Sequence, residues 1–166
     1  MYLIPVIIRI SLYIEKGDIM TVQEKSNEQL MGLLHEWYEE IRLYHVKEAK
    51  QTYLKVKESL KGLEADHYVS FYYSLLNFRY MVLVDAMSIT KDSFNQIEKL
   101  STIKDDFLFL AYYYHFFKAI HSTILANYTE AKTHYEKAEE LLIDIPDAVE
   151  KAEFEYRFST YCYQSY

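Results

Sequence analysis

The stretch YTEAKTHYEKAEELL, residues 128–142, decides the fold class of this 166-residue chain. Its apolar residues follow the pattern Tyr-x-x-Ala-x-x-x-Tyr-x-Lys-Ala, which places them on one face of a helix. The small residues Ala131 and Ala138 allow a neighbouring helix to approach closely, and Tyr135 fills the space between them. The stretch therefore predicts a helix that packs tightly against a helical partner.

This spacing matches the second helix of a tetratricopeptide repeat, in which two helices form a unit that stacks on further units. The aromatic-rich stretch from about Asp105 to Leu125 is predicted to form the first helix of the repeat. Pro146 ends the unit, and Asp147 with Glu150 is expected to cap another helix. The apolar residues of that helix are Phe154, Phe158, Tyr161 and Cys162.

The repeat array is expected to be incomplete, because the sequence stops at Tyr166 after one repeat and the first half of another. Repeats bury their core against their neighbours, and about three are usually needed for stability. The last helix is therefore predicted to expose an apolar face, which favours self-association or marginal stability.

Before the repeat, apolar residues recur at helical spacing in three segments. The first helix should begin near Asn27, because Ser26 and Gln29 have capping-box spacing. Its apolar positions are Leu30, Leu34, Trp37 and Ile41. A second helix follows a break near Tyr44, and lysines on its other faces are predicted to be solvated. Its apolar positions are Val46, Ala49, Tyr53, Val56 and Leu60.

A third helix is predicted from Asp66, which can cap it, to about Met87. It has two apolar stripes, and a helix that is apolar on two sides is covered on two sides. One stripe comprises Val69, Tyr72, Leu76, Tyr80, Leu83 and Met87, and the other comprises Phe71, Leu75, Phe78 and Val82. Three such helices with short links predict an antiparallel bundle.

The predicted fold is therefore all-α, with an N-terminal three-helix bundle followed by an incomplete tetratricopeptide-repeat array. The bundle occupies residues 20–88, a linker with a short helix occupies residues 89–103, and the truncated repeats occupy residues 104–166. The chain has only 3 glycines and 2 prolines, which favours long helices over many short strands.

Residues 1–19, which begin MYLIPVIIRISLY, are predicted not to belong to the native protein. Residues 15–20 can be back-translated into a ribosome-binding site followed by a start codon, so translation is expected to begin at Met20. The alternative is an ordinary β-like or amphipathic N-terminal segment, and its presence would allow a weak interfacial anchor. The apolar run is too short to span a bilayer and contains Arg9. No membrane association is therefore expected unless residues 1–19 are present.

The composition excludes several classes of function. A net charge of −7 argues against a nucleic-acid-binding surface, which needs clustered basic residues. The single cysteine, Cys162, cannot form an internal disulfide, so no oxidising compartment is required and a cytoplasmic location is expected. The sequence contains no glycine-rich phosphate loop, His-Glu-x-x-His motif or paired cysteines, so it predicts no metal site and no cofactor of its own.

Segments of the bundle and the repeat together resemble the Rap family of response-regulator aspartate phosphatases. They are LLHEWYEEIRLYHVKEAK (33–50), LEADHYVSFYYSLLNFRY (63–80), YTEAKTHYEKAEELL (128–142) and EKAEFEYRFSTYCY (150–163). The resemblance implies a signal-transduction protein whose bundle engages the receiver domain of a two-component or phosphorelay response regulator. Some members hydrolyse the receiver's aspartyl phosphate, and others block its DNA-binding output. A peptide switches such proteins off by binding a long repeat array, most of which this sequence lacks, so no peptide control is implied.

The resemblance also points to site residues. Phosphatase members have a glutamine at the start of the third helix, whose amide orients water for attack on the acyl phosphate. The alignment places His67 there, whereas the receiver would supply the aspartate and Mg²⁺. An imidazole can hydrogen-bond to that water or accept its proton, although His67 could equally be an exposed first-turn residue. Asp66 and Phe78 are candidate receiver contacts, and the alternative for Phe78 is packing within the bundle.

Four functions follow from these observations as alternatives. The chain binds a receiver without catalysis, or it is an active aspartyl-phosphate phosphatase in which His67 replaces the glutamine. It is a non-functional remnant of a truncated reading frame, or it is a general tetratricopeptide adaptor that binds a peptide.

Overall fold

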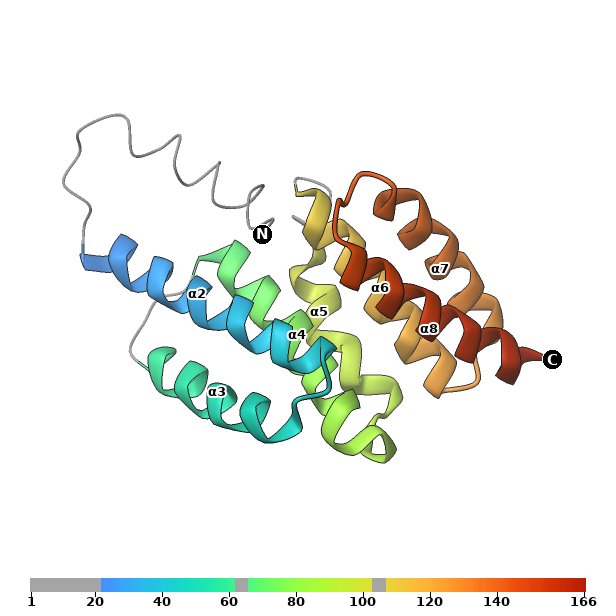
Figure 1. Ribbon diagram of the computed structural model, residues 1–166, viewed down its shortest axis with the longest axis horizontal. Coiled ribbons are helices and arrows are strands. Elements are labelled where there is room, and N and C mark those ends of the chain that lie inside the picture. Colours follow the sequence, from blue (N-terminus) through green and yellow to red (C-terminus); the bar gives the residue numbers. More distant parts are fainter. Residues whose placement is uncertain (1–21, 62–65, 103–106) are drawn as a thin grey trace.

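The computed structural model describes residues 22–61, 66–102 and 107–166, and every regular element in these ranges is a helix (Figure 1). The predicted all-α fold is therefore confirmed. The α-helices are α2 (Val22–Arg42), α3 (Val46–Ser59), α4 (His67–Asp85), α5 (Asn95–Leu100), α6 (Leu108–Ile124), α7 (Tyr128–Leu142) and α8 (Ala148–Ser165). Two short 3₁₀ helices, η1 (Ala86–Ser88) and η2 (Lys91–Phe94), lie between α4 and α5. The predicted extension at residues 1–19 lies outside the described residues.

Helices α2, α3 and α4 form the predicted bundle around Trp37, the only tryptophan of the chain. The Trp37 side chain is fully buried, and its ring centroid lies 5.4 Å from that of Tyr53 in α3 and 5.3 Å from that of Tyr80 in α4. The other predicted apolar positions of α2 are equally buried: Leu30, Leu34 and Ile41. The apolar stripe predicted for the first helix is therefore confirmed.

The start of α2 differs from the prediction. The backbone is already helical at Val22, so Ser26 lies within the helix and is not its N-cap. Gln23, Glu24 and Lys25 are good helix formers, so the helix extends through them instead of beginning at the capping-box pair.

Helix α4 is covered on two sides, as its two apolar stripes predict. On one side Tyr80 stacks on Tyr53 of α3, with ring centroids 5.0 Å apart. On the other side Phe78 meets Phe94 of η2 edge to face, with ring centroids 5.1 Å apart. Because both faces bury apolar surface, α4 joins the bundle to the elements that follow it.

The C-terminal end of the predicted third helix is also corrected. Helix α4 ends at Asp85, and the chain turns directly into η1. Met87, which was predicted to belong to the apolar stripe, is consequently 95% exposed. The stripe prediction assumed an unbroken helix, and the change to a 3₁₀ turn ends the helical register on which it depends.

Helices α6 and α7 pack together as the two helices of the predicted repeat. The small residues Ala119, Ala131 and Ala138 are fully buried, which lets the helices approach closely. Tyr135 is also buried, and its ring contacts that of Phe154 in α8 at a centroid distance of 5.9 Å. The sequence pattern of residues 128–142 therefore identified the packing face correctly.

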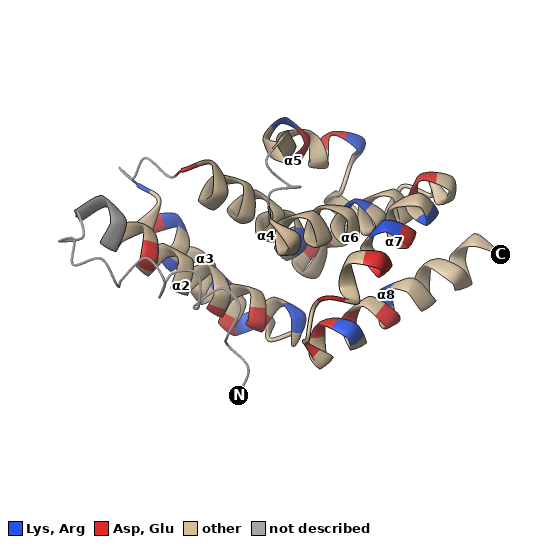
Figure 2. Ribbon diagram, turned by 90° about the horizontal axis from the view of Figure 1, so that it is seen from above, with Lys and Arg blue, Asp and Glu red and all other residues tan. Residues whose placement is uncertain are grey.

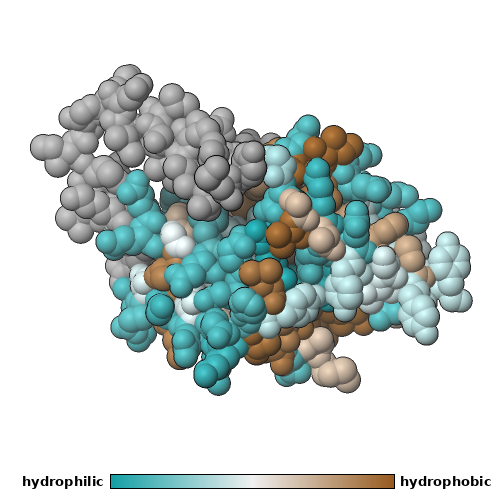
Figure 3. Space-filling view, viewed as in Figure 1, coloured by the Kyte–Doolittle hydropathy of each residue, from teal (hydrophilic) through white to brown (hydrophobic). Residues whose placement is uncertain are grey.

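One face of helix α8 packs on α6 and α7, and another face is exposed to solvent. Phe154 and Tyr161 are buried, whereas Tyr156 and Tyr163 are 59% and 89% exposed. On the face drawn in Figure 3, apolar patches are separated by hydrophilic side chains. Within the described ranges, no helix combines the length and apolar character that crossing a bilayer requires.

A buried carboxylate joins α8 to the bundle. The hydroxyls of Tyr38 in α2 and Tyr112 in α6 both donate hydrogen bonds to Glu150, at 2.8–2.9 Å. Arg42, at the end of α2, donates to Asp147 at 2.7 Å and to Glu150 at 3.3 Å. Glu150 is 1% exposed, and burial raises its pKa to about 7 even though these donors act to lower it.

The predicted capping role is therefore correct for Asp147 and wrong for Glu150. The Asp147 carboxylate accepts hydrogen bonds from the backbone N–H groups of Val149 and Glu150, at 2.9 and 3.1 Å. The Glu150 side chain turns inward, because it lies four residues before Phe154 on the buried face of α8.

A second buried ion pair joins α8 to α4. Glu153 accepts hydrogen bonds from Arg79 of α4 and from Arg157 one turn further along α8, the latter at 3.0 Å. Arg79 is 1% exposed, so its charge has little contact with solvent. Figure 2 shows that charged residues gather in the N-terminal half of α8 and are few in α4 and α6. We call Glu150, Glu153 and their partners the α8 junction.

Removing the Glu153 carboxylate should destabilise the chain strongly. Glu153→Ala leaves the buried Arg79 guanidinium without its acidic partner, and breaking a buried pair in this way costs about 3 kcal/mol or more. Urea unfolding followed by circular dichroism measures the loss. The matched control is Glu155→Ala, an exposed glutamate on the same helix, which should change stability by less than about 0.5 kcal/mol. Equal effects of the two substitutions would show that the buried pair is energetically unimportant.

Glu150 should make stability depend on pH. Its folded-state pKa lies above the ordinary value, so its contribution to stability is fully present below about pH 4.5 and declines as the pH rises to about 7. Burial lowers the pKa of His134 to about 4, which gives a contribution of opposite slope. The unfolding free energy of wild type relative to Glu150→Gln should therefore fall between pH 4.5 and 7. A flat difference for Glu150→Gln would contradict this account.

Candidate functional site

The first turn of α4 presents Asp66 and His67 to solvent. Asp66 caps the helix, and its carboxylate accepts a hydrogen bond from the backbone N–H of Val69 at 2.8 Å. His67 is the first residue of the helix, and its side chain is exposed. The N-terminal end of a helix carries a partial positive charge that favours anions. The Asp66 carboxylate already occupies this end of the helix, so the exposed His67 imidazole is the group left there for a partner to approach.

Phe78 lies elsewhere, and the structure does not bring it together with His67. The two residues are eleven positions apart in α4, which corresponds to about 16 Å along the helix axis. Phe78 is only 3% exposed and packs against Phe94 and His121. In this arrangement Phe78 serves packing, and its predicted role as a receiver contact stays untested.

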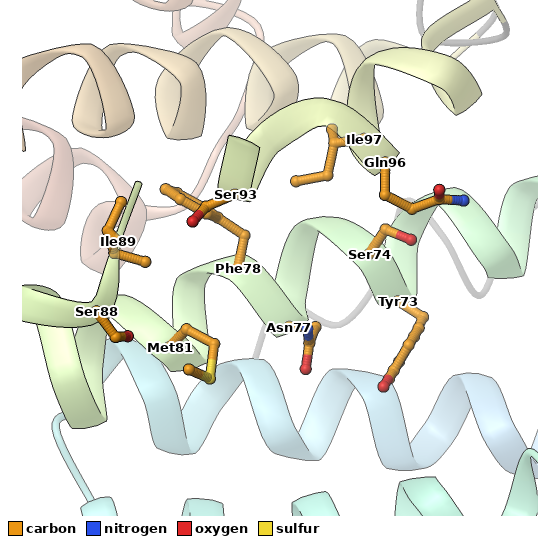
Figure 4. A pocket seen from close by; sticks show the side chains of 10 residues that line it. All are labelled: Tyr73, Ser74, Asn77, Phe78, Met81, Ser88, Ile89, Ser93, Gln96 and Ile97. Atoms are coloured by element: carbon orange, nitrogen blue, oxygen red, sulfur yellow. The ribbon is translucent and has the colours of Figure 1, made fainter. Parts of the chain in front are cut away.

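A cavity of about 270 Å³ lies beside Phe78, between α4 and the segment from η1 to α5 (Figure 4). Its apolar lining residues are Phe78, Met81, Ile89 and Ile97. Polar side chains also line it, and these are Tyr73, Ser74, Asn77, Ser88, Ser93 and Gln96. The lining contains no carboxylate, histidine or basic side chain. Such a cavity can accept an uncharged group, but it offers no acid–base pair for catalysis.

Two histidines meet between α6 and α7. The Nδ1 atoms of His115 and His134 lie 2.9 Å apart, which is hydrogen-bond distance, so the two rings are hydrogen-bonded to each other through these nitrogens. Within the described ranges, no group of three or more His, Cys, Asp or Glu side chains gathers in a way that could hold a metal ion. The histidine pair therefore joins the two helices of the repeat.

The buried charges of the α8 junction were not predicted from the sequence. Arg79, Glu150 and Glu153 are each less than 7% exposed. A signal was present, since Glu150 lies one helical turn before the apolar residue Phe154 and Arg79 lies one turn after Leu76. A charged residue at a position of an apolar stripe is either misplaced or paired with a buried partner, and here each is paired.

Comparison with known proteins places this arrangement in a family. Residues 24–85 match the family described as response regulator aspartate phosphatase H, N terminal. Response regulator aspartate phosphatase A of Bacillus subtilis (strain 168) is 29% identical over 153 residues, which is 87% of this chain and 40% of that protein. Regulatory protein RapG of the same organism is 31% identical over 126 residues, which is 76% of this chain and 34% of that protein.

The fold matches as well. The crystal structure of a Rap protein complexed with competence and sporulation factor superposes with a TM-score of 0.70 at 26% identity, covering 84% of this chain and 40% of that chain. The chain thus spans between about a third and two fifths of the length of these relatives. Because the sequence of the bundle and the arrangement of the helices point to the same proteins, this chain belongs to the Rap family.

Proposed function

We propose that this chain binds the receiver domain of a response regulator through the N-terminal end of α4. The observation that carries the proposal is the exposed pair Asp66–His67, which lies within the matched segment 24–85. It also lies where the family resemblance places a water-orienting glutamine. Matched relatives are named response regulator aspartate phosphatases, which supports a receiver domain as the partner.

The chemistry proposed for this pair is hydrolysis of the receiver's aspartyl phosphate. Water attacks the phosphorus in line, the bond between phosphorus and the aspartate oxygen breaks, and orthophosphate leaves. A neutral imidazole of His67 holds the water through a hydrogen bond and can take its proton. The receiver supplies the acyl phosphate and the Mg²⁺, so this chain contributes position and a proton acceptor.

A receiver-binding protein without catalysis is the second candidate. An imidazole reaches less far from the backbone than a glutamine amide, and catalysis by positioning is sensitive to small displacements. Two relatives of similar identity, RapG and RapF, are named regulatory proteins rather than phosphatases. In this case the chain occupies the receiver and leaves its phosphate in place.

A dephosphorylation time course separates the two candidates. A panel of receiver domains is phosphorylated with acetyl phosphate and mixed with wild type, His67→Ala or His67→Gln. If His67 acts on the water, wild type speeds phosphate release and His67→Ala slows it by about 10²-fold or more, which is the usual contribution of general acid–base catalysis. The control is His45→Ala, another exposed histidine on a helix N-terminus, which should match wild type.

The other outcomes are equally informative. Acceleration by His67→Gln alone would show that the docking surface is intact and that the native chain is a binder. Acceleration by His67→Ala equal to wild type would remove His67 from the mechanism. If no receiver in the panel binds or loses phosphate faster, the proposed function is wrong.

A further inference from the structure

The outer face of α3 carries a straight line of exposed residues. Lys47, Lys50, Leu54 and Lys57 follow one another at steps of three, four and three, so they lie along one face of the helix. The opposite face packs on the bundle through the buried residues Ala49, Thr52 and Val56. We call these four exposed residues the α3 strip.

The charge of the α3 strip is not neutralised locally. In the described part of the chain, no ion pair involves Lys47, Lys50 or Lys57, whereas Lys61 beyond them pairs with Glu58 at 2.6 Å. The helix as a whole holds four lysines and two glutamates, in a chain with a net charge of −7. Helix α3 therefore carries an excess of positive charge on an acidic protein, and the exposed Glu58 borders the strip at its C-terminal end.

An apolar side chain lies within the strip. Leu54 is 60% exposed, with Lys50 four residues before it and Lys57 three residues after it. A lone exposed leucine has little meaning. An apolar group surrounded by charged side chains, however, has the anatomy of a small interface, in which the apolar centre is buried and the charged rim steers the partner.

The C-terminal end of the helix that carries the strip lies at the same end of the bundle as the proposed receiver-binding site. Helix α3 ends at Ser59 and α4 begins at His67, and Figure 1 shows these two ends at the same end of the bundle. A domain that places its phosphorylated aspartate at His67 would therefore lie at the same end of the bundle as the C-terminal end of α3. Such an aspartate, with the carboxylates that hold Mg²⁺ next to it, makes that part of a receiver acidic.

From these observations we infer that the α3 strip docks the acidic surface of a receiver domain around its phosphorylated aspartate. The inference rests on the proposed function and extends it to a second contact region. The lysines act on the association rate through electrostatic attraction, and Leu54 acts on the dissociation rate through apolar burial.

The test is binding of an acetyl-phosphate-loaded receiver, chosen from the panel because it binds wild type, measured by surface plasmon resonance at low and high salt. The triple variant Lys47→Glu, Lys50→Glu and Lys57→Glu should lower affinity about tenfold or more at low salt, mainly through slower association. Leu54→Ala should speed dissociation several-fold, by about the effect expected for losing one partly buried apolar contact. Circular dichroism confirms that each variant remains folded.

The matched control carries the same change of charge elsewhere. Lys91→Glu, Lys99→Glu and Lys151→Glu alter three exposed lysines outside α3 and should leave affinity within about twofold of wild type. If both triple variants weakened receiver binding equally, only the overall electrostatic field of the protein would matter, and the inference would be wrong. Unchanged binding by the α3 variants would overturn the inference while leaving the proposed function intact. If no receiver binds wild type, the inference and the proposed function both fail.

Discussion

The α8 junction is the constraint on which the rest of this structure depends. A buried carboxyl group is costly unless it is hydrogen-bonded. Glu150 meets this condition only where α2, α6 and α8 come together, because its partners Tyr38 and Tyr112 belong to the first two of these helices. Glu153 adds α4 through Arg79. Each of these contacts needs the present arrangement of bundle and repeat, because a shift of the helices would leave a buried polar group without its partner.

This arrangement decides which surfaces are free for a partner. Both apolar faces of α4 are covered, so Phe78 lies in the core and the side chains left exposed at the start of the helix are Asp66 and His67. The outer face of α3 is free as well, since α3 packs on the bundle with one face only. The candidate docking region therefore comprises the exposed start of α4 at one end of the bundle and the outer face of α3, on two helices that the core holds in fixed register.

The helices of this fold follow from residue spacing, and the junction does not. Apolar residues three and four positions apart predicted the stripes of α2 and α4, and Asp66 and Asp147 predicted the starts of α4 and α8. These signals act within one or two helical turns. The pair Arg79–Glu153 joins residues 74 positions apart, so a local pattern could mark a charge as buried but could not reveal its partner. Two predictions were wrong. Helix α2 begins earlier than predicted because the residues before Ser26 have high helix propensity. Met87 is exposed because a 3₁₀ turn ends the register of α4 before it.

The α8 junction is expected to make the bundle and the repeat one cooperative unit. Trp37 is the only tryptophan and lies buried in the bundle, so its fluorescence reports the bundle alone, whereas far-ultraviolet circular dichroism reports all helices. The most direct measurement is urea unfolding of the wild-type chain followed by both signals. If the junction couples the two parts, the two signals should show coincident transitions with one midpoint. A Trp37 transition at a clearly different urea concentration would show that the bundle unfolds independently, and it would contradict the claim.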